Sequence, residues 1–385
     1  MRSWHRAPRS GLALLGAAWL VGCVATSPNP SGPASLRSEL SPTPSLTATA
    51  TATEAPSERA GWQLLPMSAF EGPAFLESVT TFRGALVAVG NTTSDTSRGA
   101  IWCSKDGLGW GSCPRIPPLD GTTLTSLGIG EPGLVVVAGS DAGAVAFLSA
   151  DGLTWSGSIL PGGPHRSALA VAWHAGRYLA IGIDYETESS PTFAWASDDG
   201  RSWTALPDVG KAGQAPNYGL VGVPEGFVAA GSFLGHGAIW TSTDGREWTR
   251  SSLPGSPDGS PGRLQLVGGR LFLPMGPDLW ISNDARHWSK TTIPGFGNGV
   301  FAVGSIPGGF VAVGRSSEGD QPGVVAVADA GLARWTLQPS DPAFVDAVAH
   351  DLVVSPDGLR LVAVGNSIGG SSVLIHADPA GFVKP

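Results

Sequence analysis

The side chains best suited to chemistry in this 385-residue sequence are aspartates that recur in one short motif. The clearest copies read Ser-x-Asp-Gly-x-x-Trp, and successive aspartates lie 40 to 49 residues apart. Carboxylates at these positions could hold a metal ion or a polar ligand. An aspartate followed by glycine also accepts hydrogen bonds from the next backbone N–H groups and thereby fixes a tight turn, so we interpret the motif as structural. Its residues are Asp106, Trp110, Asp151, Trp155, Asp199, Trp203, Asp244, Trp248, Asp284 and Trp288, with degraded copies at Asp329 and Asp378.

The same unit surrounds each copy of the motif. An apolar run ending in glycine, such as Phe227–Gly231 or Phe310–Gly314, comes before it, and a turn precedes that run. Four short strands in every 40 to 49 residues are typical of propeller blades. We therefore expect an all-β fold over residues 61–385, a seven-bladed β-propeller of four-stranded antiparallel blades. Residues 62–66 would supply the outer strand of the last blade and so close the ring.

The motif resembles the Asp-box, or BNR repeat, of sialidase-type propellers, although it is one residue tighter than the commonest form. The resemblance covers residues 62–385. It implies that the motif turns lie away from the ligand face and that each tryptophan covers apolar surface between blades. Proteins of this kind include sialidases, photosystem assembly-factor propellers, sorting receptors and bacterial lipoproteins. The resemblance therefore leaves both hydrolysis and non-catalytic binding open.

Hydrolysis of the sialidase type requires an arginine triad, a tyrosine nucleophile with a glutamate partner, and an aspartate acid/base. Arg115-Ile116-Pro117 is similar to an arginine segment of that family, but here it follows the first motif copy instead of preceding it. Tyr178 lies in an apolar run, which favours a core position. Tyr185 and Tyr218 remain candidates, with Glu186 near the first. We keep a sialidase-like glycoside hydrolase as the alternative function.

Composition argues against several other classes of function. The net charge is −8 and only 23 residues are Lys or Arg, whereas nucleic-acid binding depends on many cationic contacts to phosphate. The histidines do not follow metal-ligand spacing such as His-Glu-x-x-His, and the glycine-rich runs lack the strand-to-helix context of a phosphate loop. We expect a monomer with no metal, no cofactor and no nucleic-acid partner.

The N-terminus predicts an export signal. Residues 1–22 combine a basic start with an apolar stretch that is too short to span a bilayer. Leu20-Val21-Gly22-Cys23 resembles a bacterial lipobox, which would make Cys23 the lipidated first residue; an ordinary secretory signal is the alternative. Residues 23–60 are rich in Ser, Thr, Pro and Ala, which predicts a disordered stalk. We expect a lipid anchor on the extracytoplasmic side of a cell membrane.

Two further cysteines, Cys103 and Cys113, lie within the first repeat. An exported protein meets an oxidising compartment, so we predict that they form a disulfide, with two free buried thiols as the alternative. Their spacing is not Cys-x-x-Cys, which favours a structural bond over a redox site.

The loops between blades and those between the second and third strands of each blade share one face of a propeller. Binding residues concentrate on such loop tips because the rigid scaffold positions them. We predict a non-catalytic binding or scaffolding module for a protein or glycan at the cell envelope. The candidate ligand-face residues are Asp184, Tyr185, Glu186, Tyr218, His236 and Arg315.

Overall fold

The computed structural model describes residues 61–65, 74–92, 98–186, 192–209, 214–255, 257–297, 299–316, 323–367, 370–376 and 378–382. They belong to the second of two compact units, Pro56–Pro385. The predicted signal peptide, Cys23 and the stalk lie outside the described residues. None of the helices in the described ranges has the length and apolar character needed to cross a membrane.

The described chain is all-β, with 28 strands in antiparallel sheets and two short 3₁₀ turns, η2 (Pro342–Phe344) and η3 (Pro379–Phe382). Five of the sheets have four strands each, which confirms the predicted antiparallel four-stranded blades. The first two are β2 (Ala74–Phe82), β3 (Ala85–Thr92), β4 (Arg98–Ser104), β5 (Gly111–Ser112), and β14 (Gln214–Val223), β15 (Gly226–Phe233), β16 (His236–Ser242), β17 (Thr249–Ser252). The next two are β18 (Gln265–Val267), β19 (Arg270–Met275), β20 (Asp278–Ser282), β21 (Ser289–Thr292), and β22 (Val300–Ile306), β23 (Gly309–Arg315), β24 (Gly323–Asp329), β25 (Trp335–Leu337). The fifth is β26 (Ala347–Val354), β27 (Leu361–Ser367), β28 (Gly370–His376) and β1 (Trp62–Leu64).

The prediction of seven separate blades differs from the hydrogen-bonding pattern in one region, where eight strands form a single sheet. Its two halves join where Ser167 pairs with Gly139. A Cβ atom at Gly139 would collide with the Ser167 side chain, so the glycine allows the close approach that links the halves. The strands are β6 (Thr122–Ile129), β7 (Leu134–Ser140), β8 (Gly143–Ser149), β9 (Trp155–Ile159), β10 (Arg166–His174), β11 (Arg177–Asp184), β12 (Thr192–Ser197) and β13 (Thr204–Val209).

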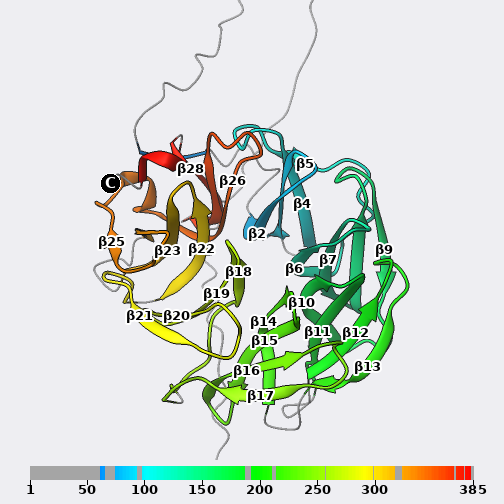
Figure 1. The fold of residues 1–385 in the computed structure, drawn as a ribbon. Coiled ribbons are helices and arrows are strands. Elements are labelled where there is room, and N and C mark those ends of the chain that lie inside the picture. The colour runs from blue at the N-terminus through cyan, green and yellow to red at the C-terminus, as the bar shows by residue number, and fades with distance from the viewer. Residues whose placement is uncertain are drawn as a thin grey trace, which may run out of the picture. The chain divides into compact units, whose positions relative to one another are not determined.

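The N-terminal strand pairs with the C-terminal strand, as the sequence predicts. β1 runs antiparallel to β28, with Trp62 opposite His376 and Leu64 opposite Leu374. The strands nearest the centre in Figure 1 are β2, β6, β10, β14, β18, β22 and β26, and β2 packs against β26. The two ends of the folded unit are therefore tied into one sheet.

A recurring β-bulge explains the glycine that ends each apolar run. In β2, β10 and β26 the register shifts by one residue opposite Gly90, Gly182 and Gly365. A Cβ atom at any of these glycines would collide with a backbone carbonyl of the bulged strand. The β18–β19 pair, whose apolar run ends in Met275 instead, has no such shift. The bulges place Glu77, Thr125, Leu169, Phe301 and His350 at corresponding levels of the innermost strands.

The core lies between neighbouring sheets. Trp110 packs with Val362 and Val373, which connects the β2–β5 sheet to β27 and β28. Trp335 packs with Phe272 and Leu279 of the preceding sheet. The tryptophans therefore bury apolar surface between sheets, the location in which they contribute most to stability.

Candidate functional site

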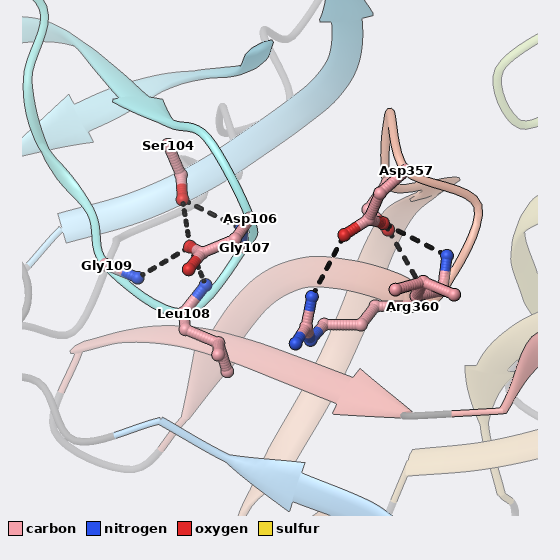
Figure 2. A network of polar contacts seen from close by, with 9 residues as sticks. Ser104, Asp106, Gly107, Leu108, Gly109, Asp357 and Arg360 are labelled. Atoms are coloured by element: carbon pink, nitrogen blue, oxygen red, sulfur yellow. Dashed lines mark hydrogen bonds and ion pairs between the residues drawn. The ribbon is translucent and has the colours of Figure 1, made fainter. Parts of the chain in front are cut away.

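The carboxylates of the recurring aspartates accept hydrogen bonds within their own turns, as Figure 2 shows for the first copy. Asp106 Oδ1 accepts hydrogen bonds from the N–H groups of Leu108 (2.9 Å) and Gly109 (3.2 Å). Ser104 Oγ accepts from the Gly107 N–H at 2.9 Å, and the Trp110 indole N–H donates to the Gly107 carbonyl at 2.7 Å. These contacts are all local, so the carboxylate sets the shape of the turn.

The same arrangement recurs at the other clear copies. The residue directly after the aspartate has a left-handed backbone, which glycine adopts easily; in the fifth copy Ala285 adopts it, with φ 60°. Trp203, Trp248 and Trp288 donate to the carbonyl of that residue, whereas the indole N–H of Trp155 lacks a hydrogen-bond partner. The aspartates that accept from following N–H groups are Asp151, Asp199, Asp244 and Asp284. Asp329 lies at the end of β24, and the Asp378 carboxylate accepts from Gly381.

A further turn of this kind was missed from the sequence. In Ser355-Pro-Asp-Gly-Leu-Arg360, Asp357 Oδ1 accepts from the Leu359 N–H at 3.0 Å, and its Oδ2 lies 3.2 Å from Arg360 Nη1. Figure 2 shows this turn beside the Asp106 turn. The Ser-x-Asp-Gly pattern could have revealed it, but no tryptophan follows at the usual distance.

The turn hydrogen bonds predict how acid affects stability. Backbone N–H groups of Ser202 and Arg201 lower the pKa of Asp199 from 3.8 to about 2. Because the folded-state pKa is depressed, the stabilisation is complete above the ordinary pKa and is lost as the pH falls towards 2. We expect Asp199→Ala to lower the urea midpoint at about pH 6, and this difference from wild type to shrink by about pH 2.5. The control is Asp208→Ala, which removes an exposed carboxylate of β13 outside the turn. A difference that stays constant across this pH range would contradict the role of Asp199.

Cys103 and Cys113 form a disulfide, with Cα atoms 5.0 Å apart. The bond joins β4 to the chain just after β5, which has only two residues. After the disulfide, Arg115 is exposed, and its backbone carbonyl accepts a hydrogen bond from the backbone N–H of Trp155 at 3.2 Å. The Arg115-Ile116-Pro117 segment is therefore part of the connection between β5 and β6.

Three of the predicted ligand-face residues, Asp184, Tyr185 and Glu186, are consecutive at the end of β11, and we call them the Tyr185 tip. The Tyr185 N–H donates to the His165 carbonyl at 3.1 Å, and the Glu186 N–H donates to Asp184 Oδ1 at 3.0 Å. His165 Nδ1 lies 3.2 Å from Glu186 Oε1. These contacts fix residues 184–186, yet the Tyr185 side chain is 68% exposed. An aromatic ring is thus presented to solvent on a preorganised backbone.

The other predicted residues lie elsewhere on the molecule. His236 Nδ1 pairs with Asp258 at 2.9 Å, at the start of β16. Arg315 ends β23. Burial of His350 lowers its pKa, and the positive charge of Arg315 lowers it further. Tyr218 lies in β14, and its side chain is outside the described set. Of the five residues whose side chains are described, three are consecutive at the end of β11, whereas His236 and Arg315 lie on other sheets.

The sequence analysis did not identify the residues that lie beside the Tyr185 tip. The Arg166 guanidinium lies 3.6 Å from the centre of the Phe193 ring, and Arg166 is opposite Asp184 in the sheet. Arg166 Nε and Thr192 Oγ1 are buried without hydrogen-bond partners. Only the pairing of β10, β11 and β12 brings these residues together, so no local pattern could have identified them.

The innermost strands line a central cavity of about 790 Å³. Its wall includes Ser78 and Val79 of β2, Asp351 of β26, and Arg263 from the segment before β18. Asp351 and Ser78 are buried, with 8% and 1% of their surface exposed. The cavity therefore contains a charged pair that the sequence analysis did not anticipate.

Two of the groups considered for sialidase chemistry have other partners in the described structure. The Tyr178 hydroxyl donates to the Gly133 carbonyl at 2.6 Å, and burial raises the pKa of Tyr178 to about 12. Glu186, which follows Tyr185 in the sequence, pairs with His165. Within the described ranges no group of three or more His, Cys, Asp or Glu side chains could hold a metal ion.

Comparison with known proteins identifies the fold. No protein-family profile matches the chain. No curated protein sequence matches it either. Among solved structures, "YCF48 bound to D1 peptide" aligns with a TM-score of 0.58 and 16% identity over 85% of this chain and 98% of that one. A chain of the mitotic checkpoint complex gives 0.56 and 12% over 84% and 98%, and the RRP9 WD40 repeats give 0.55 and 14% over 82% and 98%. The chain is therefore a β-propeller; at these identities the likeness concerns the fold alone.

Proposed function

We propose that this chain is a lipid-anchored, extracytoplasmic propeller that binds a protein or glycan without catalysis. The observation that carries the proposal is the exposed Tyr185 ring on a loop fixed by His165 and Glu186. Tyrosine and arginine dominate the energetics of protein interfaces, and here Arg166 lies stacked on Phe193 beside the tip. The neighbour solved with a bound peptide supports a peptide or protein as ligand.

We also propose that the ring has seven blades and belongs with the Asp-box propellers. The eight-stranded sheet would count as two blades, β6–β9 and β10–β13, because in the described chain the β-ladder between the halves consists of the single pair Ser167–Gly139. The turn geometry at Asp106, Asp151, Asp199, Asp244 and Asp284 supports the Asp-box assignment.

The binding surface is tested by side-by-side capture from envelope extract with the full chain and its variants. We expect Tyr185→Ala to capture at least about tenfold less of the partner than wild type does, since a central interface tyrosine contributes about 2 kcal/mol or more to binding. The matched control is Leu359→Ala, an exposed apolar residue in the β26–β27 turn at the opposite ends of the strands. Equal loss in both variants, or none with Tyr185→Ala, would contradict this surface.

The same proteins test the hydrolase alternative with a fluorogenic sialoside. We expect no turnover by wild type. Turnover that disappears with Tyr185→Phe or Tyr218→Phe would replace the binding proposal with sialidase chemistry.

The anchor is tested at Cys23. We expect mass spectrometry of the mature protein to show a lipid-modified Cys23 as first residue, and Cys23→Ala to release the protein from membranes into the soluble fraction. An unmodified N-terminus at another residue would favour an ordinary secretory signal.

A further inference from the structure

One side chain crosses the central cavity. Arg263 Nη1 lies 3.0 Å from Ser78 Oγ of β2 and 3.5 Å from Asp351 Oδ2 of β26. Around the ring, β18 contacts β22, β22 contacts β26, and β26 contacts β2. Arg263 therefore reaches over the intervening β22 sheet and connects parts of the ring that are not direct neighbours.

The acceptor side of this contact is preorganised. Asp351 Oδ2 accepts hydrogen bonds from Ser78 Oγ at 2.5 Å and from the Val79 N–H at 3.1 Å. Its Oδ1 accepts from the Leu352 N–H at 2.9 Å. Since none of these bonds involves Arg263, the hydroxyl and carboxylate keep their positions without it.

Arg263 is held less firmly than its acceptors. Its side chain is 35% exposed, against 11% for Asp351, and Nη1 makes both contacts. One carboxylate and one hydroxyl thus face one guanidinium, in a cavity large enough for another side chain.

We propose that Ser78 and Asp351 form a binding site for a guanidinium group, which Arg263 occupies in the free protein and which an arginine side chain of a peptide ligand can take over. The planar donors of a guanidinium match an adjacent carboxylate and hydroxyl better than the point charge of an ammonium does. Arg263 thus acts as a built-in competitor for this site. The site goes beyond the Tyr185 surface and does not depend on it.

The first test is chemical rescue. We expect Arg263→Ala to melt at lower temperature than wild type, and millimolar methylguanidinium to raise its melting temperature because the ion binds only the folded state. Methylurea, which has a similar shape without the charge, should have no such effect, and neither should methylguanidinium on Arg263→Ala/Asp351→Asn. Equal shifts with methylurea or with the double variant, or no rescue, would overturn the proposal. Arg263→Gln serves as the second variant if Arg263→Ala does not fold.

The second test is competition by the resident arginine. A fluorescent capped Gly-Arg-Gly peptide should bind Arg263→Ala at least about tenfold more tightly than wild type, and the matching Gly-Lys-Gly peptide should bind more weakly. Tyr185→Ala should leave this binding unchanged, which separates failure of this site from failure of the proposed ligand surface. Equal affinity of the arginine peptide for wild type and Arg263→Ala, or no binding to either, would contradict the proposal.

Discussion

Trp203→Ala should destabilise the fold by about 3–5 kcal/mol, the usual cost of truncating a buried tryptophan. Trp203 is 8% exposed and packs in one cluster with Val135 of β7 and Tyr178 of β11. Its side chain therefore joins the two halves of the eight-stranded sheet, which share a single β-ladder pair in the described chain. Removing the indole leaves a cavity at the point where the halves depend on side-chain packing.

The measurement is equilibrium unfolding in urea. If the variants share the wild-type dependence of unfolding free energy on urea concentration, a shift in the midpoint reports a change in stability. Trp203→Phe retains an aromatic ring and loses the hydrogen bond from the indole N–H to the Gly200 carbonyl. It should cost roughly 1–2 kcal/mol. Leu234→Ala, at a side chain 71% exposed, is the surface control. A loss below about 1 kcal/mol for Trp203→Ala would show that the tryptophan does not stabilise the sheet in this way.

The fold was predictable where its determinants are local. Each aspartate turn is completed within three residues of Asp106 or Asp199, so a short motif specifies its geometry. The regular spacing of these turns predicts four-stranded units, and the unmatched strand at Trp62 predicts closure with the C-terminus. The fusion of β6–β13 into one sheet was not predictable, because it depends on the close approach of Gly139 to Ser167.

The site was predictable only in part, for the same reason. Asp184, Tyr185 and Glu186 are neighbours in sequence, and the structure places them on one loop tip. Arg263 and Ser78 are 185 residues apart, and Ser78 and Asp351 are 273 apart. Nothing in their local sequence distinguishes them from other polar residues, and ring closure alone brings them into contact.

Ring closure itself gives the second large effect, because Trp62 anchors the strand that joins both ends of the folded unit. Trp62 is 9% exposed and packs edge-on against Phe344, with ring centres 5.2 Å apart. Its backbone N–H donates to Asp341 Oδ2 at 3.0 Å, a bond that Trp62→Ala would keep, so the variant tests the side chain alone. We expect Trp62→Ala to cost about 3–5 kcal/mol.

The local consequence distinguishes lost closure from a general loss of stability. Without its anchor, β1 should detach from β28 and expose that strand's edge, so amide hydrogen exchange should accelerate in Gly370–His376 much more than in β15. Leu64→Ala, at a 40% exposed position of the same strand, should change neither exchange nor stability by much. Uniform acceleration in β28 and β15 would mean that Trp62 supports the core without closing the ring. Selective exposure of β28 would mean that β1, residues Trp62–Leu64, closes the propeller.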